Sequence, residues 1–311
     1  MNPLVLRTPE TCFDKLPDFP WDPNYLTVQH PEHGPLRLHY LDVGPVDGPV
    51  VLMLHGEPTW CFLYRHMIRA LSAQGLRCIA PDLIGFGRSD KLVRRQDYSY
   101  AAHVGWIADL VNSLDLREVT LVCQDWGGPI GLSVLARDPA RFAAVVAANT
   151  LLPTCEAPPK GVPDWPGDIV TQWVAATATA DDLPVGDTVA AVCVNPLPDA
   201  VRAAYDAPFP EPAYKAGPLE FPSLIPIRED MPGTAENRAT WRLLETWEKP
   251  FVTAFSDSDP STAAWAEVFR QRIPGARGQP HPVIAGAGHF LQEEQGPALA
   301  DVVSKQVQPP G

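Results

Sequence analysis

The sequence lacks three features that would place it in a specialised class of protein. No uncharged apolar run approaches the ~20 residues that a helix needs to cross a bilayer. None of the six cysteines forms a C-x-x-C pair, so their spacing suits neither a zinc site nor a small disulfide framework. The N-terminal residues show no basic stretch followed by an apolar core, which predicts no signal peptide. We therefore expect a soluble, reduced, cytoplasmic protein without a metal site.

Positive charge is also scarce. The 311 residues include 24 Lys and Arg against 37 Asp and Glu, which gives a formal net charge of −13. Such an acidic surface repels nucleic-acid phosphates and anionic lipids, so neither nucleic acid nor a membrane is an expected partner. Hydrophobic residues make up 45% of the chain and charged residues 20%, which is typical of a folded globular protein.

Short apolar runs alternate with amphipathic stretches in the first half of the chain. The predicted strands are 50–54, 77–81, 119–123 and 143–148, and the predicted helices are 62–73, 103–114 and 127–137. Continuous apolar strands that alternate with helices predict an α/β protein with a mostly parallel sheet covered on both faces. The segment 36–43 alternates more strictly, which allows an antiparallel edge strand.

Proline interrupts this alternation in the middle of the chain. The sequence has 36 prolines, and they are dense between positions 153 and 232. The strand–helix pattern resumes at 249–256, and a further strand is predicted at 282–285. We predict one α/β core, residues 1–150 and 231–311, with a helical cap inserted at 151–230. Such an insertion is expected over the carboxyl ends of the strands, where ligands bind in open α/β sheets.

The first chemical motif, Cys123-Gln124-Asp125-Trp126-Gly127, lies at a predicted strand-to-helix junction. A nucleophile elbow follows the pattern small-x-nucleophile-x-Gly, because its tight turn leaves no room for large flanking side chains. Gly127 fits this pattern, Cys123 replaces the usual first glycine, and Asp125 takes the position of the nucleophile. The alternative is an ordinary helix start with an aspartate N-cap, and this motif alone does not decide between the two.

The second motif, His55-Gly56-Glu57-Pro58, directly follows the strand predicted at 50–54. A His-Gly turn at this point can present a backbone N–H that pairs with the N–H after the nucleophile to form an oxyanion hole. A plain β-turn is the alternative. Because a glutamate that points into a site is costly unless it is used, Glu57 is also a candidate for positioning a water or a nearby histidine.

The third motif places His289 in a glycine-rich loop after the strand predicted at 282–285. An acid must lie between the nucleophile and this histidine, and Asp257 and Asp259 both follow the strand predicted at 249–256. We favour Asp259, three residues past Ser256, and expect Asp257 to cap the following helix. Nucleophile, acid and histidine then occur in the order that α/β-hydrolase enzymes use.

Together these motifs resemble the haloalkane dehalogenases, in the subfamily with HGEPTW, PDLIGFGRSDK, QDWGG and AGHF blocks. The blocks stand here at His55–Trp60, Pro81–Lys91, Gln124–Gly128 and Ala287–Phe290, and the resemblance covers nearly the whole chain. It implies an α/β-hydrolase fold with a mostly parallel eight-stranded sheet, helices on both faces and a helical cap insertion. It also implies hydrolysis of haloalkanes to a primary alcohol, a halide and a proton. We expect a monomer that needs no cofactor.

An aspartate nucleophile suits this chemistry, because a carboxylate attacks saturated carbon better than acyl carbon. Asp125 is predicted to displace the halide and form an alkyl ester. His289, the general base, oriented by Asp259, is predicted to activate a water that hydrolyses the ester. The backbone N–H groups of Glu57 and Trp126 are the predicted oxyanion hole.

The leaving halide needs donors in a dry pocket, and an indole N–H on a large apolar ring provides one. Trp126 directly follows the nucleophile. The resemblance implies a second tryptophan in the cap; Trp173 aligns best with it, and Trp165 is the alternative.

Two other functions stay open at this point. An epoxide hydrolase shares the Asp-His-Asp machinery but needs acidic donors, usually two cap tyrosines, and Tyr205 and Tyr214 are candidates. A catalytically silent binding protein with the same fold is the second alternative. The presence of all three candidate catalytic residues, Asp125, His289 and Asp259, disfavours it. Metal-dependent hydrolysis lacks a ligand cluster in the sequence.

Overall fold

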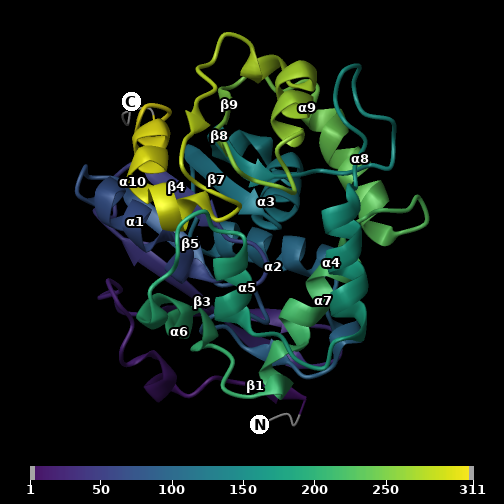
Figure 1. The fold of residues 1–311 in the computed structure, drawn as a ribbon. Helices are drawn as coiled ribbons and strands as arrows, with labels where there is room; N and C mark the ends of the chain where they lie inside the picture. The colour runs from purple at the N-terminus through teal and green to yellow at the C-terminus, as the bar shows by residue number, and fades with distance from the viewer. Residues whose placement is uncertain (1–3, 308–311) are drawn as a thin grey trace.

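The computed structural model describes residues 4–307 and is built around one large sheet (Figure 1). In those residues the sheet has seven strands in the order β2-β3-β5-β4-β7-β8-β9. The strands are β2 (Asn24–His30), β3 (Gly34–Val43), β4 (Val50–Leu54), β5 (Arg77–Pro81), β7 (Val119–Asp125), β8 (Phe142–Thr150) and β9 (Phe251–Thr253). Strand β3 runs antiparallel to both β2 and β5, and all other neighbours are parallel. The predicted α/β class with a mostly parallel sheet is confirmed.

Helices cover both faces of the sheet, which explains why the parallel strands are continuous apolar runs. On one face α1 (Arg65–Ser72) packs against α10 (Leu291–Ser304), and on the other α2 (Tyr100–Ser113), α3 (Gly127–Arg137) and α8 (Pro232–Leu244) pack together (Figure 1). Helix α9 (Trp265–Arg272) packs beside β8 and β9. The strands predicted at 50–54, 77–81, 119–123 and 143–148 are β4, β5, β7 and β8.

The prediction of eight strands in this sheet needs correction. The strand expected at 282–285 is β11 (Val283–Ile284), and it pairs with β10 (Phe255–Ser256) in a separate two-stranded parallel ladder. The backbone N–H of Thr253 in β9 donates to Nδ1 of His281 at 3.1 Å instead of to a strand carbonyl. Strand β9 is the edge of the seven-stranded sheet, and β10 begins only one residue after β9 ends. A second short antiparallel ladder joins β1 (Val5–Leu6) to β6 (Lys91–Leu92).

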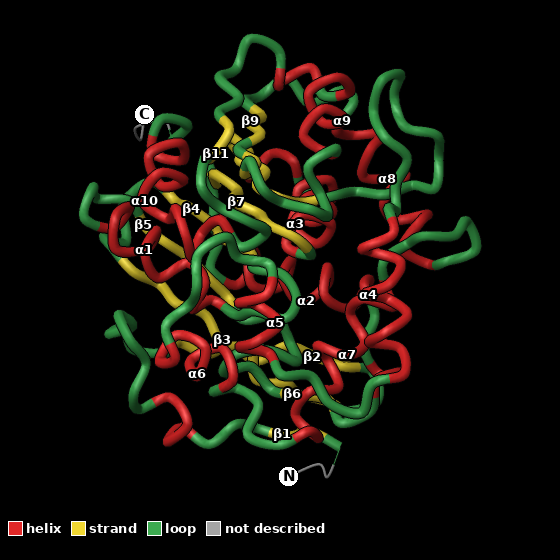
Figure 2. Tube along the Cα trace, in the orientation of Figure 1, coloured by secondary structure: helices red, strands yellow, loops and turns green. Residues whose placement is uncertain are grey.

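Between β8 and α8 the chain forms only helices and loops (Figure 2). The helices are α4 (Asp168–Thr179), α5 (Val185–Ala191), α6 (Asp199–Asp206) and α7 (Ala216–Leu224); α4 packs against α7, and α5 against α6. The indole N–H of Trp60 donates to the carbonyl of Ala204 at 3.1 Å, which fastens this helical segment to the core. The division into a core and a cap at residues 151 and 230 is still a prediction. The predicted ends of the core, residues 1 and 311, lie outside the described residues. Among those residues no helix combines the length and apolar character that crossing a bilayer requires.

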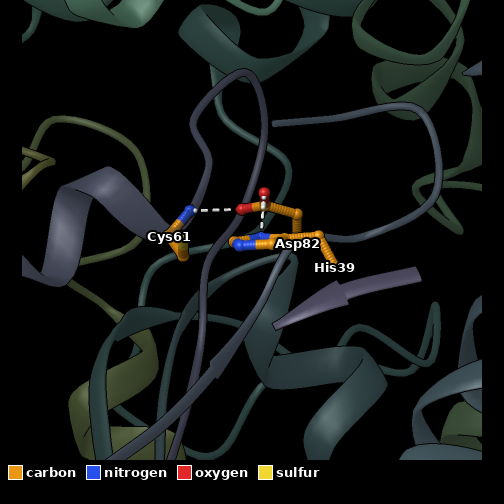
Figure 3. Close-up of side chains that lie close together, drawn as sticks. All are labelled: His39, Cys61 and Asp82. Atoms are coloured by element: carbon orange, nitrogen blue, oxygen red, sulfur yellow. Dashed lines mark hydrogen bonds and ion pairs between the residues drawn. The ribbon is translucent and has the colours of Figure 1, made fainter. Parts of the chain in front are cut away.

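A buried carboxylate, Asp82, directly follows β5 and joins three segments of the chain (Figure 3). Its Oδ1 accepts from the backbone N–H of Cys61 at 2.8 Å, and its Oδ2 accepts from Nδ1 of His39 and from the backbone N–H of Arg88, each at 2.7 Å. Burial would raise the pKa of Asp82, but His39 and these hydrogen bonds outweigh it and hold the pKa of that carboxyl below its usual range. The loop after β4 is thereby fixed to β3 and to the loop after β5.

Candidate active site

Asp125 is the last residue of β7 and has a φ of 49°, in the left-handed region that is costly for a residue with a side chain. The hydroxyl of Thr150 at the end of β8 donates to the carbonyl oxygen of Asp125 at 2.6 Å and helps to hold this turn. A Cβ on Gly127 would lie 2.0 Å from the carbonyl oxygen of Leu54, so only glycine permits β4 to approach the elbow so closely. The structure therefore has the strained strand-to-helix turn that the sequence motif predicts.

The loop after β4 reaches the carboxylate of Asp125 directly. The backbone N–H of Glu57 donates to Oδ1 of Asp125 at 2.8 Å. A Cβ on Gly56 would lie 2.1 Å from that same oxygen, which explains why glycine precedes Glu57. Trp126 is the N-cap residue of α3, so its backbone N–H belongs to the donors at a helix start that lack an intrahelical partner. In the described part of the chain, no hydrogen bond from this N–H to Asp125 is present.

His289 lies between two carboxylates. Its Nε2 is 3.4 Å from Oδ2 of Asp125, and its Nδ1 is 3.1 Å from Oδ1 of Asp259. The structure thus brings Asp259 to the histidine and leaves Asp257 outside, where an exposed carboxylate accepts the backbone N–H of Gly286 at 2.9 Å. The expectation that Asp257 caps the next helix is wrong, because it binds the loop before His289 instead.

The charge of these groups sets the protonation of His289. Burial lowers the pKa of His289, but the Asp259 and Asp125 carboxylates outweigh burial and raise it to about 10. Burial likewise opposes the charge of Asp259, while His289 and the hydroxyl of Thr262 hold the pKa of Asp259 below its usual range. At neutral pH His289 is therefore an imidazolium as long as Asp125 keeps its charge. Loss of the Asp125 charge would remove one of the two groups that hold this proton.

A cavity of about 450 Å³ lies against Asp125 and His289. Its wall is mostly apolar and includes Leu151, Val170, Ala176, Val192, Pro222 and Ile225. The helical segment between β8 and α8 supplies most of this wall. The end of β7 and the loops after β4 and β11 supply the charged groups, Asp125, Glu57 and His289. The cavity can therefore take a small apolar molecule beside an ionised carboxylate.

Three tryptophans line the cavity, and the two candidates for the second halide donor differ in their contacts. Nε1 of Trp173 donates to Oε2 of Glu57 at 3.2 Å, next to the backbone N–H that holds Asp125. Trp165 packs edge-on against Trp265, with ring centroids 5.7 Å apart, and its buried Nε1 has no partner in residues 4–307. The third is Trp126. These contacts favour Trp173 over Trp165 as the group nearer the nucleophile.

Two residues that hold His289 were not singled out in the sequence. Gln124 donates from Nε2 to the carbonyl of His289 at 3.2 Å, and the same atom lies 3.1 Å from Nε2 of the imidazole. Asn149 donates from Nδ2 to the carbonyls of Gly288 and His289, at 2.9 and 3.0 Å. A polar residue at the end of the apolar run of β8 was the available signal for Asn149.

The tyrosines considered for an epoxide lie elsewhere. The hydroxyl of Tyr205 donates to Oε2 of Glu293 at 2.6 Å, and neither Tyr205 nor Tyr214 is among the described residues that line the cavity. The cluster of His39, Cys61 and Asp82 in Figure 3 is compact enough for a metal ion. However, the oxygens of Asp82 already accept three N–H groups, which marks the cluster as a structural junction.

Residues 49–295 match the family model described as alpha/beta hydrolase fold. The curated haloalkane dehalogenase of Psychrobacter cryohalolentis is 49% identical over 299 residues, and that of Mycolicibacterium paratuberculosis is 46% identical over 299 residues; each match covers 96% of both chains. The tetrameric haloalkane dehalogenase DpaA from Paraglaciecola agarilytica has a solved structure with a TM-score of 0.86 and 35% identity, covering 96% of this chain and 97% of that one.

The two aspartates after β10 should affect the histidine very differently. We expect Asp259→Asn to lower the pKa of His289 from about 10 by about one to three pH units, because an opposite charge in contact is removed. Asp257→Asn is the matched control and should leave that pKa unchanged. An NMR pH titration of the histidine ring resonances measures both; a larger drop in Asp257→Asn would contradict the assignment.

Proposed function

The chain belongs to the haloalkane dehalogenase family of enzymes with the α/β-hydrolase fold, and on this premise we propose that Asp125, His289 and Asp259 are its catalytic residues. The enzyme hydrolyses carbon–halogen bonds of haloalkanes, as its family does. One observation carries the assignment: Oδ1 of Asp125 is held by the N–H of Glu57, while Oδ2 faces His289 at 3.4 Å. The two oxygens of one carboxylate thus have different environments.

In the first step Oδ2 of Asp125 attacks the carbon that bears the halogen. A C–O bond forms, the C–halogen bond breaks, and the halide leaves with its electron pair. The product is an alkyl ester of Asp125 in which Oδ1 is the carbonyl oxygen. The mostly apolar wall favours this step, because it excludes water that would otherwise solvate the carboxylate.

The second step hydrolyses the ester. Esterification removes the charge of Asp125, so the pKa of His289 falls and its proton leaves to the solvent as the proton product of the reaction. The neutral imidazole can then accept a proton from the attacking water. The water attacks Cγ of Asp125, and negative charge develops on Oδ1. The N–H groups of Glu57 and Trp126 are the proposed donors to that oxyanion. Collapse of the intermediate, with the proton returned from His289, releases the alcohol and leaves Asp125 as a carboxylic acid that contains the water oxygen. Its proton passes to His289, which restores the carboxylate and the imidazolium of the starting state.

The halide is proposed to bind between the indole N–H groups of Trp126 and Trp173. Both rings line the cavity, and an indole offers a donor without an acceptor, which suits an anion in apolar surroundings. The contact between Trp173 and Glu57 supports the choice of Trp173 over Trp165, because it keeps the indole N–H close to the nucleophile.

Epoxide hydrolysis and a silent binding role are less well supported. An epoxide oxygen needs an acidic donor pair, and the tyrosines considered for it lie outside the cavity wall that the structure describes. Release of bromide from any bromoalkane would exclude the silent role. A halide-release screen across C2–C6 chloro-, bromo- and epoxyalkanes tests these functions together.

The oligomeric state and the cellular location of the enzyme are the remaining parts of the proposal. We propose a cytoplasmic monomer, although DpaA from Paraglaciecola agarilytica forms a tetramer in its structure. Light scattering in solution distinguishes the two assemblies.

His289→Phe should stop the reaction at the ester, because no base remains to activate water. After incubation with 1-bromobutane, intact-protein mass spectrometry should show one added butyl group, and peptide mapping should place it on Asp125. The double variant Asp125→Ala/His289→Phe is the control and should gain nothing. Loss of activity without an adduct would mean that His289 acts before the ester forms or only supports the fold.

Trp173→Phe should weaken bromide binding roughly 10- to 150-fold, because a hydrogen bond to a charged partner contributes about 1.5–3 kcal/mol. Saturable quenching of tryptophan fluorescence by bromide measures this affinity. Trp165→Phe changes the same residue type in the same cavity and should bind bromide as the wild type does. If Trp165→Phe loses binding and Trp173→Phe keeps it, Trp165 is the second donor.

A further inference from the structure

The side chain of Glu57 has no task in the steps above, although its backbone N–H does. Its carboxyl lines the cavity, and only 6% of the residue is exposed. Oε2 accepts the indole N–H of Trp173 at 3.2 Å, while Oε1 is buried and has no partner within residues 4–307. A buried carboxyl with one unpaired oxygen is costly, which calls for a function beyond packing.

The contact with Trp173 ties this carboxyl to the proposed halide site. An indole has a single N–H, and that of Trp173 donates to Oε2 of Glu57. A halide that binds to the same N–H must displace Glu57 from it. A carboxylate would also repel the anion in a site of low polarity, whereas a neutral carboxylic acid would not.

We propose that Glu57 and the product halide compete for the indole N–H of Trp173, so that the enzyme holds halide while Glu57 is a neutral acid and releases it when Glu57 ionises. This inference rests on the proposed role of Trp173 as a halide donor. It couples the departure of the halide to the ionisation of Glu57, which takes up a proton again before the next halide is held.

The groups that face Glu57 determine when it ionises. Burial raises the pKa of Glu57 well above its usual value, and the negative charge of Asp125 on β7 raises it further. The hydrogen bond from Trp173 on α4 and the charge of His289 act in the opposite direction without reversing the shift. Because the pKa of His289 is about 10, this histidine keeps its proton at pH 6–9 as long as Asp125 is ionised. Glu57 therefore ionises at a higher pH than an ordinary glutamate, next to a histidine that keeps its proton.

The test is the pH dependence of bromide binding by the free enzyme, followed by tryptophan fluorescence between pH 6 and pH 9. In the wild type we expect the Kd for bromide to rise with pH, approaching about tenfold per pH unit once Glu57 ionises, because one proton is linked to one anion. Glu57→Gln keeps a neutral side chain of the same shape and should give a Kd that does not change with pH. Glu229→Gln, an exposed position outside the cavity, is the control and should follow the wild type.

A second measurement needs no variant and covers the case in which Glu57→Gln fails to fold. Calorimetry of bromide binding to the wild type in two buffers with different ionisation enthalpies gives the number of protons taken up per bromide. We expect uptake to rise toward one proton per bromide as the pH increases and Glu57 ionises in the free enzyme. A Kd that is flat with pH in the wild type, zero proton uptake, or the same pH slope in Glu57→Gln would each overturn the inference.

Failure of the inference can be separated from failure of the proposed halide site. If Trp173→Phe weakens bromide binding but Glu57→Gln keeps the wild-type pH slope, Trp173 is a halide donor and Glu57 only packs against it. If Trp173→Phe binds bromide normally, the halide site itself is misassigned and the coupling to Glu57 fails with it.

Discussion

The loop after β4 and the turn after β7 meet at one hydrogen bond, from the backbone N–H of Glu57 to Oδ1 of Asp125. The contact needs glycine at position 56, where a Cβ would lie 2.1 Å from the same oxygen, and it needs Asp125 to keep a φ of 49°. Asp82 accepts the backbone N–H of Cys61 and so holds the loop after β4, and the hydroxyl of Thr150 supports the turn after β7. Because Oδ1 is held by the hydrogen bond from Glu57, Oδ2 is the oxygen that faces His289. This is why Oδ2 is the proposed nucleophile and Oδ1 the proposed carbonyl oxygen of the ester.

The charge of Asp125 determines when His289 can act as a base, and this sets the order of the two steps. His289 lies between Asp125 and Asp259 and holds a proton while both carboxylates are ionised, since its pKa is raised to about 10. An alkyl ester on Asp125 neutralises one of these charges, so the histidine becomes a base only after the first step is complete. Asp259 keeps its charge throughout, because the hydroxyl of Thr262 and the backbone N–H groups of Ser261 and Thr262 also stabilise the carboxylate.

The sequence predicts the parts of this molecule that local pattern encodes. Continuous apolar runs identify the parallel strands β4, β5, β7 and β8, and the order Asp125, Asp259, His289 identifies the triad's candidates. Spacing alone favours Asp259 over Asp257, and the structure brings Asp259 to the histidine. Features set by tertiary contacts are not predictable in this way. The strand predicted at 282–285 pairs with β10 outside the seven-stranded sheet, and the N–H of Thr253 on the edge strand β9 binds a side chain 28 residues away. The contact between Trp173 and Glu57 joins positions 116 residues apart, which no spacing rule encodes.

The central claim is that a carboxylate oxygen of Asp125, and not water, forms the bond to the substrate carbon. A single turnover in H₂¹⁸O, with enzyme in excess over a bromoalkane, tests it most directly. If Asp125 is the nucleophile, the alcohol from this first turnover carries ordinary oxygen taken from the enzyme, and peptide mass spectrometry finds ¹⁸O in the carboxylate of Asp125. Labelled alcohol together with an unlabelled Asp125 would show that water attacks the substrate directly and would contradict the account.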